Sequence, residues 1–177
     1  NKEDYPNIPK LEGTFQTISS ELFLQGLESV AYAVSHTDIK PELNTVYITT
    51  KSGTTYFVAT DTFRLAEKKL QIPHFELESS ICIPQKSIEQ LLSLFATYTG
   101  TLSICFSESQ ISITHPSYYY TTRLVQGLYP QYEQIIPKTE ETVGIVLVSD
   151  IQKGIKSAAI FSDAINQVSL TLDKESI

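Results

Sequence analysis

Side chains that could carry out acid–base, nucleophilic or metal chemistry are few and scattered along this sequence. His36, His74 and His115 fall in predicted loops or at strand ends, which is typical of surface histidines. Cys82 and Cys105 lie among apolar neighbours in predicted strands, and the sequence has no CxxC pair or Cys/His cluster. We therefore expect two buried free thiols, no metal site, no cofactor and no enzyme activity.

One carboxylate and one guanidinium do lie close together, Asp61 and Arg64, where a polar turn interrupts the strand pattern. At this spacing a turn-stabilising pair is more common than a general acid and base. Phe63 and Leu65 in the same segment would form a small apolar spot on the surface. That spot indicates either a peptide-binding site or an ordinary exposed turn.

The composition is that of a globular protein. Of 177 residues, 41% are hydrophobic and 19% are charged, and no apolar run approaches the roughly 20 residues that cross a bilayer. Phosphate-binding glycine loops and the common catalytic motifs are absent from the sequence. The net charge of −7 argues against a module that grips nucleic acid through its phosphates. Buried thiols and the lack of a visible signal peptide predict a cytoplasmic protein.

Hydrophobic periodicity predicts an α+β fold, with helices on one face of antiparallel sheets. The predicted strands cover residues 14–18, 45–50, 54–60, 65–70, 79–83, 102–106, 111–113, 118–124, 142–148 and 167–172. The predicted helices begin at Ser19 or Ser20, at Pro84 and at Ser149. Ser19 and Ser20 are N-cap candidates, and Ser149 with Gln152 fits a capping box.

A repeat within the chain indicates tandem duplicated domains. The segment Gln25–Ala31 aligns with Lys153–Ala159, and each places a glycine, Gly26 or Gly154, inside a predicted helix. Glycine in a helix interior costs about 1 kcal/mol relative to alanine, so we prefer duplication over a chance match of two amphipathic helices. The chain contains no Met and ends soon after a predicted strand and turn. We therefore expect a fragment of a longer protein.

Five segments carry sequence motifs. The most distinctive is Ala59–Ala66, which reads ATDTFRLA. The others are Asp4–Pro6 (DYP), Lys40–Asn44 (KPELN), Ile83–Lys86 (IPQK) and Leu124–Lys138 (LVQGLYPQYEQIIPK). By motif, order and spacing the chain resembles the bacterial DNA sliding clamps, the beta subunits of DNA polymerase III. The corresponding motifs of that family include ATDGHRLA, RPxLNG and LxxGxFPDYxxxxPK.

The resemblance implies the DNA-clamp fold, in which each protomer has three similar domains. Two protomers close head to tail around duplex DNA, and the ring tethers the polymerase without catalytic residues. On this basis residues 1–12 are an interdomain linker, residues 13–138 are the middle domain, and residues 139–177 are the truncated start of the last domain. An acidic net charge is compatible with enclosing DNA. The full-length protein is implied to be a homodimer, whereas we expect this fragment to be monomeric.

The resemblance also implies a pocket between the middle and last domains. It binds short peptides of the replicative polymerase, the clamp loader and other partners. Carried over by motif, the middle-domain side of this pocket consists of Leu43, Thr60, Thr62, Phe63, Arg64, Leu65, Pro130 and Ile135. Leu43, Leu65, Pro130 and Ile135 form an apolar floor for Leu and Phe side chains of the peptide. Arg64 orients the rim, and Tyr132 packs beneath it.

Two positions depart from the family motifs. Thr62 stands where the family commonly has Gly, and Gln134 stands where many members carry Arg, so a different turn backbone and one missing rim charge are expected. Lys86 opens the second predicted helix, where the family places basic residues that face DNA, and Lys40 lies by a loop that can also approach DNA. A solvated surface lysine is the alternative for each. The alternative function is a peptide-binding α+β module without a DNA role. An enzyme would need a polar cleft that the sequence does not indicate.

Overall fold

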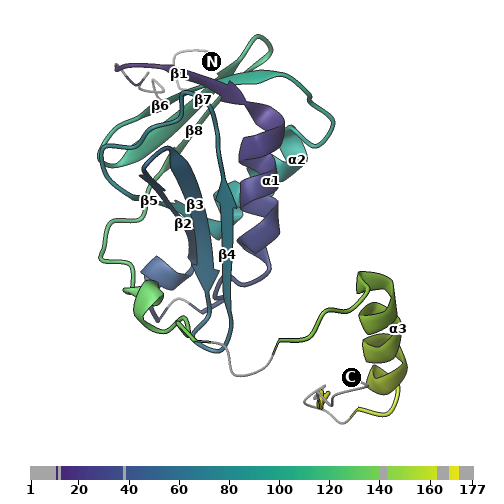
Figure 1. Ribbon diagram of the computed structural model, residues 1–177. Coiled ribbons are helices and arrows are strands. Elements are labelled where there is room, and N and C mark those ends of the chain that lie inside the picture. The colour runs from purple at the N-terminus through teal and green to yellow at the C-terminus, as the bar shows by residue number, and fades with distance from the viewer. Residues whose placement is uncertain (1–10, 12, 38, 140–142, 163–167, 172–177) are drawn as a thin grey trace. The chain divides into compact units, whose positions relative to one another are not determined.

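The structure is a computed structural model that describes residues 11, 13–37, 39–139, 143–162 and 168–171 (Figure 1). The chain forms two compact units, Asn1–Pro130 and Gln131–Ile177. Among the residues described, no helix is long and apolar enough to span a membrane. The predicted linker, residues 1–12, lies outside the described residues apart from Leu11.

Two four-stranded antiparallel sheets make up most of the first unit. The first sheet has the order β1 (Gln16–Ser19), β6 (Thr101–Phe106), β7 (Gln110–His115), β8 (Tyr118–Arg123). The second sheet has the order β4 (Leu65–Leu70), β3 (Thr54–Thr60), β2 (Thr45–Lys51), β5 (Ile81–Pro84). Eight of the predicted strands are therefore confirmed to within a few residues at their ends. The β2–β3 hairpin turns at Ser52 and Gly53, both with positive φ.

Two helices, α1 (Ser20–Ala31) and α2 (Gln85–Leu94), lie on one side of the sheets (Figure 1). The hydroxyl of Ser19 caps α1 by accepting the Leu22 amide at 3.3 Å, as its residue type predicts. The apolar stripe of α1 buries Phe23, Leu27 and other residues against both sheets. The predicted α+β arrangement, with helices on one face of antiparallel sheets, is confirmed.

The glycine inside α1 lets the helix approach the second sheet closely. A Cβ atom built on Gly26 would lie 2.4 Å from a ring carbon of Phe57 in β3. Phe57 is fully buried and packs edge-on against Phe23, with ring centroids 6.0 Å apart. Only hydrogen fits at position 26, which explains why a residue of poor helix propensity occurs there.

The second unit differs from the sequence prediction. Its described residues form a short 3-10 turn, η3 (Tyr132–Gln134), and the helix α3 (Val148–Ala159). The strand predicted over residues 142–148 is wrong, because described residues 143–147 form no strand and Val148 already begins α3. Residues 168–171 are not a strand either, and the rest of that predicted element lies outside the described residues. A strand needs a hydrogen-bonded neighbour, and the described part of this unit provides none.

The start of α3 also differs from expectation. Leu147 occupies the N-cap position and makes no side-chain cap, so the predicted capping box of Ser149 with Gln152 is wrong. The Ser149 hydroxyl instead donates to the carboxylate of Asp150 at 3.3 Å. Gly154 has nothing within 4 Å of its built Cβ position, unlike its counterpart Gly26. The two aligned helices therefore share a sequence pattern but not the packing that explains the glycine.

Candidate functional site

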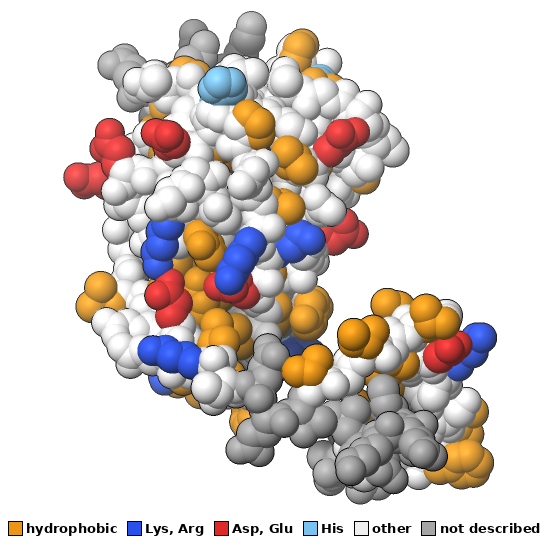
Figure 2. Space-filling view, viewed as in Figure 1, with side chains coloured by type: hydrophobic (Ala, Val, Ile, Leu, Met, Phe, Trp, Pro, Cys, Tyr) orange, Lys and Arg blue, Asp and Glu red, His pale blue; other side chains and the backbone are white. Residues whose placement is uncertain are grey.

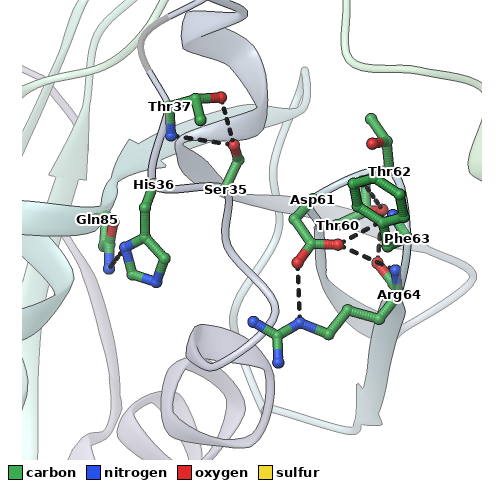
Figure 3. Close-up of polar contacts among 9 residues, drawn as sticks. All are labelled: Ser35, His36, Thr37, Thr60, Asp61, Thr62, Phe63, Arg64 and Gln85. Carbon is green, nitrogen blue, oxygen red and sulfur yellow. Dashed lines mark hydrogen bonds and ion pairs between the residues drawn. The ribbon is translucent and has the colours of Figure 1, made fainter. Parts of the chain in front are cut away.

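The turn between β3 and β4 is held by a dense set of hydrogen bonds (Figure 3). One carboxylate oxygen of Asp61 accepts the amides of Phe63 and Arg64, each at 3.0 Å. The Thr60 hydroxyl donates to the Arg64 carbonyl at 2.7 Å and accepts the Thr62 amide at 3.2 Å. The Arg64 amide, followed by that of Phe63 and the Arg64 side chain, holds the pKa of Asp61 below its usual value. Residues 60–64 therefore form a preorganised turn, and the predicted turn-stabilising pair is confirmed.

The side chain of Arg64 is held from two sides. Its Nε donates to the second carboxylate oxygen of Asp61 at 2.9 Å. Its guanidinium carbon also lies 5.8 Å from the ring centroid of Tyr32, at the C-terminal end of α1. About half of the Arg64 side chain remains exposed, so the cation is fixed in position but still open to solvent.

The tip of the turn departs from ordinary backbone geometry. Thr62 has a φ of 79°, in the left-handed region that glycine adopts without strain. Threonine thus occupies a conformation that favours glycine, and the expected difference from the family's turn backbone stays a prediction. The next residue, Phe63, has 97% of its surface exposed, as predicted. The turn therefore combines a strained residue with a fully exposed aromatic ring.

Three predicted site residues lie at one end of the second sheet. Thr60 and Leu65 face each other as the last pair of the β3–β4 ladder. The antiparallel β2–β3 register brings the start of β2 to the same end. Leu43 lies there too, because it ends the short 3-10 turn η2 (Pro41–Leu43) just before β2. Leu43 is almost fully buried, whereas Leu65 is half-buried.

Tyr129 brings the end of the first unit to the same sheet. Its ring stacks on that of Tyr47 in β2, with centroids 4.6 Å apart and planes 18° from parallel. Burial raises the pKa of the Tyr129 phenol. The next residue, Pro130, is exposed. The stack thus fixes the backbone directly before Pro130 against the second sheet.

Ile135 belongs to the second unit, so its position relative to the other seven predicted site residues stays a prediction. It follows η3 and is largely exposed, as is Gln134, whereas Tyr132 is buried. The proposed packing of Tyr132 beneath the pocket is likewise untested.

The two lysines predicted to face DNA are both exposed but occupy different elements. Lys86 lies in the first turn of α2, and Lys40 precedes η2. Figure 2 shows basic side chains interspersed with acidic ones on the face in view, rather than gathered into one basic surface. This arrangement fits isolated phosphate contacts better than a continuous nucleic-acid groove.

Among the described residues, no three His, Cys, Asp or Glu side chains group in a way that could hold a metal ion. Cys82 and Cys105 are buried free thiols, as predicted. His36 is exposed and bonds Gln85 at 3.1 Å, and His74 is exposed (Figure 3). His115 differs from the surface position expected for it, because it is half-buried, with its ring centroid 4.4 Å from that of Tyr98.

One residue of the candidate site was missed by sequence reasoning. Tyr32 follows directly after α1 and has 62% of its surface exposed, and its ring covers Arg64. The available signal was a large aromatic residue just beyond the apolar stripe of a helix. Its pairing with a side chain on another element could not be predicted from spacing.

Comparison with known proteins gives a consistent result. The family model described as the DNA polymerase III beta subunit, central domain, matches residues 17–131. The beta sliding clamp of Streptococcus pneumoniae serotype 4 is 25% identical over 175 residues, covering 98% of this chain and 46% of the relative. The beta sliding clamp of Buchnera aphidicola is 29% identical over 167 residues, covering 90% of this chain and 44% of the relative.

Solved structures show the same fold. The DNA polymerase sliding clamp of Bacillus subtilis aligns with a TM-score of 0.86 at 24% identity, covering 93% of this chain and 44% of that one. A sliding clamp of Bartonella birtlesii, solved bound to griselimycin, aligns with a TM-score of 0.81 at 25% identity, covering 93% and 46%.

The first unit has the fold of a clamp domain, because its two helices and two four-stranded antiparallel sheets align with these sliding-clamp structures. The chain belongs to the DNA polymerase III beta subunit family, whose central-domain model matches more than half of it. It spans about half the length of the curated relatives it matches.

Proposed function

We propose that this chain is part of a DNA sliding clamp, a processivity factor that tethers a replicative polymerase to its template. In the full-length ring it encircles duplex DNA and holds the polymerase, the clamp loader and other partners through short peptides. The observation that carries the proposal is the ordered turn Thr60–Leu65, in a chain whose residues 17–131 match the central domain of the family. The role requires binding and no chemistry.

The proposed peptide site combines an apolar floor with a rim that the ordered turn holds in place. Leu43 and Leu65 lie at the same end of the second sheet, and Pro130 follows the Tyr129 stack. We assign Ile135 to the same floor. The rim consists of Thr60, Thr62, Phe63 and Arg64 on the ordered turn. Apolar anchors in such a pocket supply most of the binding energy, while fixed polar groups set orientation.

In the proposed protein, residues 1–12 link domains, residues 13–138 are the middle domain, and residues 139–177 begin the last one. DNA contacts are few and independent of sequence, with Lys86 and Lys40 as candidates for screened phosphate contacts. Processivity then follows from the topology of the ring and not from tight contact, which fits a net charge of −7. The protein works in the cytoplasm as a homodimer. The isolated chain is monomeric, and light scattering that gave a stable dimer would contradict this assignment.

The test is an NMR titration of the 15N-labelled chain with a short peptide that contains Gln-Leu and Leu-Phe. We expect weak binding with amide shift changes at Leu43, at Thr60–Leu65 and at residues 131–135, which follow Pro130. A scrambled peptide of the same composition is the control. The Leu65→Ala variant, which shortens a half-buried side chain at the sheet end, is expected to weaken binding about tenfold. The same titration on the longer parent protein separates a missing opposite wall from a wrong assignment. No localised shifts in either protein at millimolar peptide would overturn the proposal.

A further inference from the structure

Tyr32 occupies a fixed position although its ring is largely exposed. It is the C-cap residue of α1, and the next two residues, Ala33 and Val34, are fully buried. The backbone at position 32 is therefore anchored on both sides. Exposing an aromatic ring to water normally costs free energy. Here the ring lies over a cation on a different element, and that contact offsets part of the cost.

The ring of Tyr32 completes a three-sided restraint on Arg64. The turn hydrogen bonds fix the Arg64 backbone, and Asp61 binds Nε at 2.9 Å. The Tyr32 ring faces the guanidinium carbon at 5.8 Å. A long side chain held in this way loses less conformational entropy when it binds a ligand. Because Asp61 engages Nε, the two terminal Nη groups are the donors left to meet a partner.

We propose that Tyr32 is a positioning residue of the peptide site, and that it holds Arg64 ready to bind a carboxylate of the partner peptide. This inference rests on the proposed function of the site. The planar guanidinium pairs with carboxylates through two parallel hydrogen bonds. A fixed Arg64 therefore favours peptides that carry an acidic side chain at one particular position.

The surroundings of Arg64 favour an acidic, partly apolar peptide over a nucleic acid. The exposed ring of Phe63 on the same turn offers an apolar contact. Asp61 lies directly beside the cation and repels a string of phosphates. The chain as a whole is acidic, with a net charge of −7. Most of the surface therefore repels an acidic peptide, whereas Arg64 attracts it. Binding is then selective for the site at Arg64 instead of being spread over the surface.

The test compares two peptides that are identical except for one Asp or Asn, by calorimetric titration at low salt. The wild-type chain is expected to bind the Asp peptide about twofold to fivefold more tightly than the Asn peptide. Tyr32→Leu is expected to remove at least half of that preference, measured as the ratio of the two dissociation constants. Tyr32→Phe keeps the ring and should keep the preference. Arg64→Gln should abolish it.

A second measurement reads the contact without any peptide. The Arg64 Nε–H resonance lies near an aromatic ring, so Tyr32→Leu should shift it and Tyr32→Phe should not. Because Tyr32 is exposed, both variants should keep the wild-type melting temperature. If neither this chain nor the longer parent protein binds either peptide, the proposed function and this inference are overturned together. Normal peptide binding with an unchanged Asp preference in Tyr32→Leu overturns the inference alone. So does a Tyr32 effect seen with duplex DNA and not with the acidic peptide.

Discussion

Thr62 combines a branched side chain with a φ of 79°. The left-handed region costs a residue with a Cβ about 1–2 kcal/mol, whereas glycine reaches it freely but orders at a cost of about 0.5–1 kcal/mol. Thr62→Gly is therefore expected to raise the free energy of unfolding by about 0.5–1 kcal/mol, measured by urea denaturation. The hydrogen bond from the backbone N–H of residue 62 to the Thr60 hydroxyl survives the change, because it does not use the Thr62 side chain.

The matched control is Thr101→Gly, at an exposed threonine that begins β6, where the backbone is extended and pairs with Ser19. There glycine relieves no strain and loses strand propensity, so stability should fall. A loss of stability in Thr62→Gly of the same size as in the control would mean that the turn stores no strain.

Burial makes two groups sensitive to alkali. The pKa of the Cys82 thiol is raised from 9.0, and that of the Tyr129 phenol is raised from 10.0, mainly because the charged forms are desolvated. The stabilising effect of each raised pKa is complete below the unfolded pKa and is lost as pH rises through the folded one. Between pH 9 and 11 the unfolded chain releases protons that the folded chain keeps, so the free energy of unfolding falls.

Urea unfolding at pH 8, 9.5 and 10.5 checks this expectation. Tyr129→Phe keeps the stack on Tyr47 but removes one titrating group, so its stability should fall less steeply above pH 10. Identical slopes for the variant and the wild type would show that Tyr129 titrates alike in the folded and unfolded chains.

Helices α1 and α3 contain equivalent glycines in unlike surroundings. Gly26→Ala places a Cβ within 2.4 Å of the fully buried Phe57 ring, so we expect a loss of about 1–3 kcal/mol from overpacking. Gly154→Ala meets nothing within 4 Å and gains helix propensity, so α3 should become more helical. Circular dichroism and urea denaturation of both variants check the pair. Equal effects of the two substitutions would contradict the packing explanation.

The sequence was informative where local pattern and tertiary packing agree. The hairpin Thr45–Thr60 has β-branched strands and a turn that accepts positive φ, and it formed as predicted. The strand predicted over residues 142–148 had the same apolar character, but strands depend on neighbours that periodicity does not reveal. Within the candidate site the turn was readable from one short motif. The Tyr32–Arg64 contact joins two separate elements and left no pattern in spacing.

At the scale of the whole molecule, topology should matter more than affinity. With 20 acidic and 13 basic residues, the isolated chain is expected to bind duplex DNA more weakly than about 100 μM at physiological salt. Fluorescence anisotropy of a labelled duplex measures this. Salt-sensitive binding in the low micromolar range would mean that the chain grips DNA directly.

The full-length parent offers a sharper test of ring topology. Once loaded on circular DNA it should stay bound, and it should be released when the DNA is cut, because a ring slides off a free end. A peptide-binding module without a DNA role would show no difference between circular and linear DNA. Release profiles from gel filtration before and after cutting distinguish the two.

The stack of Tyr129 on Tyr47 ties the last segment of the first unit to a strand made much earlier in synthesis. The floor and rim of the proposed site come from segments on either side of that closure. A nascent chain still short of residue 129 has neither this stack nor Pro130, so the proposed floor is incomplete. A peptide that binds there would therefore recruit partners only to finished molecules. In the laboratory, the amount of this peptide bound at saturation would measure the correctly folded fraction of a preparation.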